Sequence, residues 1–233
     1  MFSKEKFDDY RNKFKSFLLK GGQLDETYKW TALGAFEEHW NIGATDMATM
    51  IDKSFQQGEG ERLWSDKNDS AKSVMVEFAK MSPEITRDIF EDLYRETSDV
   101  VLRMDRFVYH CDQMLADLQK LRPSANYHYH EDYVMISFYL SVKHPELYTV
   151  YNYSNFKMLL TKLGAKSMPA LKELDRYFKV TRIFQKFLTQ DEDLIEAYKE
   201  YMRKTENSPE INMIMTHDFI AACTNSSYQL DKY

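Results

Sequence analysis

The sequence predicts an all-α protein of about nine or ten helices, and three observations support this fold class. Glycine and proline are few, at 7 and 5 of 233 residues, so long elements are seldom interrupted. Aromatic residues make up 15% of the chain and methionine occurs 13 times, which supplies large side chains for helix packing. Many apolar residues recur at three- and four-residue spacing, the period of a helix with one buried face. One short β element near 148–151 remains open as an addition to this fold.

The first helix is expected over Lys4–Leu19. It places Phe7, Phe14 and Phe17 on one face and lysines around the other, which is the pattern of an amphipathic helix. Such a helix can lie on a membrane surface or dock on the protein's own core, and docking is the preferred interpretation. Gly21 and the glycine after it are expected to end the helix.

Capping residues mark where the next helices begin. A helix N-cap is typically Ser, Thr, Asp or Asn, because its side chain accepts an unpaired N–H of the first turn. Proline at the first helical position strengthens the signal at Ser82, which Pro83 follows. The helix after Ser82 is expected to run to about Glu96. Residues 98–99 are expected either to start a new helix, which runs to about Leu121, or to kink one longer helix. The expected caps in this half of the chain are Asp25, Thr45 or Asp46, Ser70, Ser82, and Ser98 or Asp99.

Residues 127–156 hold three of the six histidines and a dense run of tyrosines. Apolar residues alternate from Val134 to Val142, which suggests a strand, but they also fit helical spacing. The length of the segment favours a helix from His130 to Lys143. This helix should end there, because Pro145 disfavours helical geometry at the residue before it. A short extended piece is expected to follow it.

The remaining chain predicts three or four more helices, again from their caps and stops. One is expected from a cap at Ser154 to about Leu163, with Gly164 as its stop. The next is expected to begin at Pro169, the next to run from Asp191 to about Lys204, and the last to begin near residues 207–210. No repeat and no linker-like composition separates two domains. We therefore expect an N-terminal helical part, 1–122, and a C-terminal helical part, 123–233, packed as one continuous unit.

Composition limits the classes of function. The net charge is −6 and the pI is 5.6, whereas a dedicated nucleic-acid binder usually has a basic balance. Any contact with DNA would therefore use a local patch. Two distant cysteines give no disulfide framework and fit a reducing compartment. Neither a signal peptide nor an apolar stretch long enough to span a membrane is recognisable, so we expect a cytoplasmic protein without a membrane partner.

Catalytic and metal-binding motifs are weak. The residues GAKS at 164–167 resemble the end of a phosphate-binding loop, but Ala165 separates the glycine from the lysine and a helix precedes them. His128 and His130, followed by Glu131 and Asp132, form a possible metal cluster, yet no metal-binding motif supports it, and a cluster at a helix N-terminus is the preferred interpretation. His110 beside Cys111 is interpreted as a packed pair. We therefore expect no catalytic residues, no metal and no cofactor.

Tyrosines and lysines interleave in the central segment. Tyrosine rings can stack on bases and lysines can contact phosphates, so this pattern is compatible with DNA binding, including the capture of a flipped base. The competing interpretation, which we weight more heavily, is that the tyrosines pack at the margin of the core. The candidate nucleic-acid-binding residues are Tyr129, Lys143, Tyr148, Tyr151, Tyr153, Lys157, Lys162 and Lys166.

A second candidate surface lies in the polar, loop-like stretch at 56–69. Trp64 is flanked there by Arg62 and Lys67, and a tryptophan in a polar loop can serve as an exposed recognition residue. The alternative, which we prefer, is that Trp64 folds back onto the core.

Four segments resemble, in the same order, the N-terminal regions of bacterial McrB-like AAA+ NTPases, the motors of modification-dependent restriction systems. They are YKWTALGAFEEHWNI at 28–42, MVEFAKMSPEITRDIFEDLYRETSDVVLRMDRF at 75–107, YLSVKHPELYTVYNYSNFK at 139–157 and NMIMTHDFI at 212–220. The resemblance spans nearly the whole chain, and its motifs are helical rather than catalytic. Two positions depart from it, since His144 replaces the usual aromatic residue before the proline and Asn152 replaces a usual lysine.

The resemblance implies a recognition or regulatory domain of a restriction or antiviral defence system, without catalysis of its own. It implies an AAA+ motor domain in the same chain and a nuclease subunit as partner. We expect the domain to sense DNA, modified DNA included. The alternative is a protein-interaction or oligomerisation domain that makes no direct contact with DNA, and the acidic balance favours this alternative.

Overall fold

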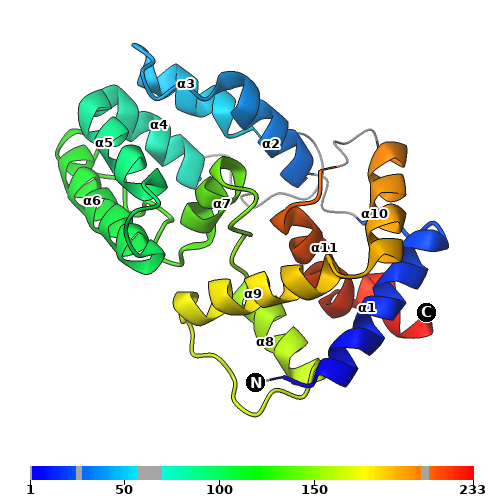
Figure 1. Ribbon diagram of the computed structural model, residues 1–233. Helices are drawn as coiled ribbons and strands as arrows, with labels where there is room; N and C mark the ends of the chain where they lie inside the picture. The colour runs from blue at the N-terminus through cyan, green and yellow to red at the C-terminus, as the bar shows by residue number, and fades with distance from the viewer. Residues whose placement is uncertain (1, 25–27, 57–69, 206–209) are drawn as a thin grey trace. The chain divides into compact units, whose positions relative to one another are not determined.

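The computed structural model describes residues 2–24, 28–56, 70–205 and 210–233, and regular structure in these ranges is entirely helical (Figure 1). It comprises eleven α-helices and two short 3₁₀-helices, somewhat more than expected, and none of these ranges contains a strand. The all-α prediction is therefore confirmed. The β element allowed near 148–151 does not form, and these residues have no regular secondary structure.

The chain divides into two compact units. Unit 1 comprises Met1–Asp25 and His144–Tyr233, and unit 2 comprises Glu26–Lys143. Unit 1 is thus built from both ends of the chain, with unit 2 inserted between them. The boundary expected between 122 and 123 falls inside unit 2. The segment after that position stays attached to the preceding helix, since the Gln119 side-chain amide donates to the carbonyl of Ala125 over 2.8 Å.

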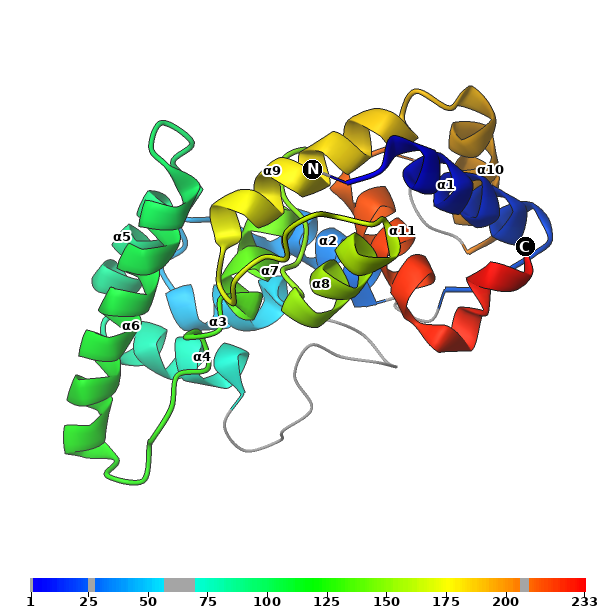
Figure 2. The ribbon, with the colours of Figure 1, turned by 90° about the horizontal axis from the view of Figure 1, so that it is seen from below.

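The described residues of unit 2 form six α-helices, and the predicted caps explain where several begin. Asp46, Ser70 and Asp99 each accept backbone N–H groups of the following turn, and Pro83 is the first residue of its helix. In Figure 2, α5 and α6 lie side by side. The helices are α2 (Tyr28–His39), α3 (Met47–Ser54), α4 (Ala71–Met81), α5 (Pro83–Tyr94), α6 (Val100–Leu121) and α7 (Val134–Lys143).

The core of unit 2 is a cluster of aromatic rings. Phe55 and Phe90 are both fully buried, and their ring centroids lie 5.8 Å apart in a stacked arrangement. The ring of Tyr139, from α7, lies 4.5 Å from Phe55 and 5.4 Å from Phe90. Aromatic pairs at such separations contribute about 0.5–1.5 kcal/mol beyond their buried area. This cluster holds α7 in the centre of the unit.

The helix expected from His130 begins later, at Val134. Tyr133 has φ 65° and Tyr129 has φ 62°, left-handed conformations that interrupt a right-handed helix. The Asp132 carboxylate accepts the N–H of Val134 over 3.0 Å. The acidic residue therefore precedes the helix rather than occupying its first turn, and residues 128–133 form a separate segment.

Unit 1 contains the two ends of the chain. The prediction of Lys4–Leu19 is confirmed, and the helix expected from Asp191 begins one residue later, at Glu192, with Asp191 as its cap. Two predicted starts are wrong: Asn152 rather than Ser154 caps one helix, and the helix expected from Pro169 begins at Leu174. The predicted cap at 207–208 lies outside the described ranges, and Asn212 caps the last α-helix. The elements are α1 (Lys4–Leu19), α8 (Tyr153–Lys162), α9 (Leu174–Leu188), α10 (Glu192–Lys204), α11 (Met213–Thr224), η1 (Ser226–Tyr228) and η2 (Leu230–Lys232).

The apolar face of α1 is buried inside unit 1. Phe7 is fully buried, and its ring stacks on Phe184 of α9 at 5.3 Å and contacts Phe219 of α11 at the same distance. Phe14, also fully buried, lies 5.7 Å from Phe219. The amphipathic helix thus docks on its own core, as preferred from the sequence. Among the helices in the described parts of the chain, none combines the length and apolar content that crossing a bilayer requires.

Candidate functional site

The predicted nucleic-acid-binding residues do not all belong to one unit. Tyr129 and Lys143 belong to unit 2, and the other six belong to unit 1. Tyr129 is 37% exposed, and the exposed Lys143 places its ammonium 5.9 Å from the ring centre of Tyr94. The predicted residues are therefore divided between the two units.

Tyr148 and Tyr151 are core residues, which agrees with the interpretation preferred from the sequence rather than with the alternative of exposed stacking residues. Their exposed fractions are 2% and 3%. The Tyr148 ring packs edge-on against Phe178 at 5.3 Å, and the Tyr151 ring packs against Tyr177 at 5.0 Å. The hydroxyl of Tyr151 also accepts the N–H of Lys172 over 3.0 Å. A base cannot stack on rings that the core already covers, so both residues leave the candidate site.

The other four predicted residues lie on or just after α8. Lys157 is exposed, with its ammonium 5.7 Å from the ring centre of the half-buried Tyr153, and Lys166 is also exposed. Lys162 is half-buried and donates to the carbonyl of Cys223 over 2.8 Å, which commits it to a structural role. Lys157 and Lys166 are thus the most accessible of these cations. The predicted recognition residues Arg62, Trp64 and Lys67 lie outside the described ranges.

A local basic stretch surrounds these two lysines. Residues 153–190 contain eight lysines and arginines but only two acidic residues, a net charge of +6 in a chain whose total is −6. Four of the cations follow α9 at three- and four-residue spacing, on the face opposite its buried residues. Their order along the helix is Arg176, Lys179, Arg182 and Lys186. We call the exposed cations of 153–190 the basic surface.

The two units differ in charge. Unit 1 has 18 basic and 16 acidic residues, a net charge of +2, whereas unit 2 has 13 basic and 21 acidic residues, a net charge of −8. The total composition conceals this difference. A charge count taken segment by segment would have found the basic surface, whereas the search for interleaved tyrosines and lysines found only part of it.

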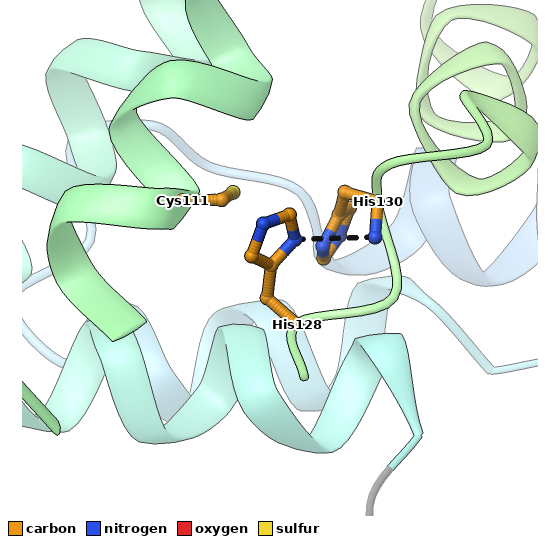
Figure 3. Close-up of side chains that lie close together, drawn as sticks. All are labelled: Cys111, His128 and His130. Carbon is orange, nitrogen blue, oxygen red and sulfur yellow. Dashed lines mark hydrogen bonds between the residues drawn. The ribbon is translucent and has the colours of Figure 1, made fainter. Parts of the chain in front are cut away.

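A second cluster lies inside unit 2 and joins three residues far apart in sequence. Cys111 of α6 and His128 and His130 of the segment before α7 are buried, and one potential ligand atom from each lies within 4.8 Å of the others (Figure 3). In Figure 3 the Cys111 sulfur points toward the His128 ring, and the His130 ring lies on the other side of that ring. We call these three side chains the Cys-His-His cluster.

Hydrogen bonds fix the orientation of both imidazoles. His128 Nε2 lies 3.0 Å from a carboxylate oxygen of Asp112, and His128 Nδ1 accepts the backbone N–H of His130 over 3.2 Å. His130 Nε2 lies 3.1 Å from the hydroxyl of Tyr139. Burial, reinforced by the neighbouring His128, lowers the pKa of His130 to about 3, so its ring is neutral at physiological pH. Burial also raises the pKa of the Cys111 thiol.

The sequence identified the two histidines but not their third neighbour. Cys111 was paired with His110, its neighbour in sequence, yet adjacent residues on a helix point in different directions. The preferred interpretation as a helix N-terminal cluster is wrong, since both rings are buried and α7 begins only at Val134. Only the packing of 128–130 against α6 brings Cys111 to the histidines.

The other polar motifs have structural roles. Gly164 has φ 66°, and its N–H and that of Ala165 bond to carbonyls of Thr161 and Leu160, so these groups close the end of α8 instead of cradling phosphate. The buried Asp218 accepts the Tyr198 hydroxyl over 2.6 Å.

Comparison of this chain with protein-family models, curated proteins and solved structures found no match.

Proposed function

We propose that this chain is a non-catalytic recognition domain that contacts DNA through the basic surface of unit 1. The observation that carries the proposal is the net charge of +6 over residues 153–190 in an otherwise acidic protein. Lysines and arginines that neutralise phosphates release condensed counterions, which supplies affinity independent of base sequence. The strongly acidic unit 2 repels a phosphate backbone, so a duplex is steered toward unit 1.

The sequence resemblance supplies the biological setting of this proposal. In an McrB-like restriction or antiviral defence system, such a domain in the cytoplasm would deliver DNA, including DNA with modified bases, to an AAA+ motor in the same chain and a nuclease in another. The buried Tyr148 and Tyr151 take no part in the revised site. The contacts proposed here are to phosphates, and the residues that would distinguish a modified base are not assigned.

Fluorescence anisotropy with short duplexes, unmodified or carrying modified cytosine, tests this proposal at several salt concentrations. The test variant combines Lys157→Gln, Lys166→Gln and Lys186→Gln on the basic surface. The matched control combines Lys53→Gln, Lys80→Gln and Lys120→Gln, three exposed lysines of unit 2. Each lost phosphate contact should lower the slope of log affinity against log salt by about 1, so the test variant should lose up to about 3 and the control none.

Two outcomes contradict the DNA proposal. One is the absence of binding by the wild-type chain at low salt, where phosphate contacts are strongest. The other is an equal loss of affinity in the two triple variants, which would assign binding to overall charge rather than to this surface.

A second candidate function, protein interaction or self-association, is favoured by apolar side chains within the same stretch. Leu171 is 65% exposed, Met158 44% and Ile183 42%, and exposed apolar groups among cations are typical of an interface. Sedimentation of the wild-type chain and of Leu171→Asp/Ile183→Asp distinguishes the two functions. Self-association that the double variant abolishes, together with unchanged DNA affinity, would favour this second function.

A further inference from the structure

The Cys-His-His cluster offers the donor set of a transition-metal site. Thiolate and imidazole are the ligands that zinc(II) prefers, and structural zinc sites combine four such ligands in a tetrahedron. With Zn–S of about 2.3 Å and Zn–N of about 2.0 Å, tetrahedral ligand atoms lie about 3.4 Å apart. The three ligand atoms lie within 4.8 Å of one another. Bringing them to the tetrahedral separation shortens the longest distance by at most about 1.4 Å.

One nitrogen of the cluster makes no hydrogen bond of ordinary geometry. This atom is His130 Nδ1, which is fully buried, whereas Nε2 of the same ring lies by the Tyr139 hydroxyl. An unsatisfied buried polar atom costs about 1–3 kcal/mol, so a native structure seldom leaves one without a reason. If Nε2 carries the proton and donates to the Tyr139 hydroxyl, the lone pair of Nδ1 remains available. That is the tautomer a metal ion requires, with a second polar group that orients the ring.

Two carboxylates, those of Asp112 and Glu131, lie near His128. His128 Nε2 lies 3.0 Å from Asp112 and 3.6 Å from Glu131, separations close to those between ligands of one ion. The site would also be electrically balanced. The two positive charges of zinc are offset by one thiolate and one carboxylate, and a neutral assembly is far less costly to bury than a separated charge.

We propose that Cys111, His128 and His130 bind one zinc(II) ion, with the carboxylate of Asp112 or Glu131 as the fourth ligand. On binding, the Cys111 thiol releases its proton to solvent and the sulfur forms a bond to zinc, while each histidine donates a ring-nitrogen lone pair. In His128 the ring proton moves from Nε2, which bonds to zinc, to Nδ1, so the ring exchanges both of its present hydrogen bonds, with Asp112 and with the N–H of His130, for the bond to zinc. With four protein ligands the site is closed, so its role is structural: it fastens residues 128–130 to α6.

Titration of the full-length chain, first stripped of metal with a chelator, tests the site with cobalt(II) as a spectroscopic probe. We expect a thiolate-to-cobalt charge-transfer band that saturates near one equivalent and disappears when zinc(II) is added. Cys111→Ala should abolish the band. Cys223→Ala, which removes the other buried cysteine of the chain, is the matched control and should keep it. Circular dichroism reports whether each variant folds.

A conservative variant tests the orientation of His130 without opening a large cavity. Tyr139→Phe keeps the ring but removes the hydroxyl at His130 Nε2, and loss of such a supporting group typically weakens metal binding about 10–100-fold. Of Asp112→Asn and Glu131→Gln, the variant that loses the fourth ligand should bind zinc at least tenfold more weakly. Unchanged affinity in both would overturn the assignment of a carboxylate ligand.

The wild-type chain alone can overturn the proposal, so the test does not depend on a variant that folds. Absence of a charge-transfer band at any cobalt concentration would mean that the cluster is only a packed and hydrogen-bonded group. A band that survives in Cys111→Ala, or that is lost in Cys223→Ala, would assign the thiolate ligand to a different site and equally contradict the proposal.

Discussion

The two units differ in the kind of contact that the following examples show in their interiors. In unit 1, α1 is held by apolar ring contacts in which Phe7 and Phe14 meet Phe184 and Phe219. In unit 2, the ring cluster around Tyr139 continues into ionisable groups, because His130 bonds to its hydroxyl. Buried Arg103 of the same unit also pairs with Glu96 over 2.8 Å. The ring contacts of α1 depend only on complementary shape. The polar contacts of unit 2 also require that each hydrogen-bonding or charged partner is correctly placed.

The two units also differ in charge. Unit 1 carries a net charge of +2 and the basic surface, whereas unit 2 carries −8. We therefore expect unit 1 to bind a polyanion and unit 2 to bind a metal ion in its interior.

The largest effects are expected from removing a core ring in either unit. Phe90→Ala in unit 2 and Phe184→Ala in unit 1 each delete a fully buried ring, and such changes cost about 3–5 kcal/mol of unfolding free energy. Hydrogen exchange should increase mainly within the unit that carries the substitution. Both effects are measured by chemical denaturation and by exchange resolved along the sequence. Equal loss of protection throughout the chain in both variants would show that the units unfold as one.

An intermediate effect is expected at Asp191, which caps α10 and joins it to α1. Its carboxylate accepts the N–H of Leu194 over 3.0 Å and pairs with Lys15 at 3.0 Å and Arg11 at 3.3 Å. Asp191→Ala should cost about 1–2 kcal/mol, the upper range for loss of a cap, measured by denaturation at neutral pH. Asp46→Ala is the matched control in unit 2, an exposed cap whose loss should cost less.

Asp191 also predicts a loss of stability in acid. Burial raises the pKa of this carboxyl, but the N–H of Leu194 and the cations Lys15 and Arg11 outweigh burial and hold it below its ordinary value. A lowered pKa in the folded state adds stability above the unfolded pKa of about 4, and this stability is lost as the pH falls below that value. The difference in stability between wild type and Asp191→Ala should therefore shrink below about pH 4. A difference that stays constant from pH 7 to pH 3 would refute this role for the charge.

The smallest effect is expected from Tyr151→Phe, which separates the two interpretations of the tyrosines. The variant keeps the buried ring and removes the hydroxyl that accepts the N–H of Lys172, so it should cost about 1 kcal/mol. Because Tyr151 lies in the core, DNA affinity in the anisotropy assay should not change. A selective loss of affinity for modified DNA in this variant would restore Tyr151 to the recognition site.

The start of a helix was predictable where a single polar residue precedes a segment with periodically spaced apolar residues. Ser70 is such a residue, and its cap forms. Of the two candidates Thr45 and Asp46, Asp46 is the cap. The prediction failed where polar residues compete, as at Asn152 and Ser154. Both are good caps by type, and the geometry of the preceding turn decides between them.

The candidate sites were less predictable, for two physical reasons. Tyrosine has an apolar body and a polar tip, so the sequence does not reveal whether its ring is covered, and Tyr148 and Tyr151 proved to be core residues. Left-handed backbone at Tyr129 and Tyr133 is unusual for tyrosine and carries no local signal. That geometry turns 128–130 toward α6, and only the tertiary fold places Cys111 beside both histidines.

The discontinuity of unit 1 has a consequence for synthesis on the ribosome. The residues that cover Phe7 and Phe14 belong to α9 and α11, beyond the 118 residues of 26–143. At about 5–20 residues per second, α1 leaves the ribosome roughly 6–24 s before any of unit 1's second segment is made. During that delay its phenylalanines have no partner, while unit 2 is already able to fold. The nascent chain therefore exposes an apolar helix that a chaperone can bind.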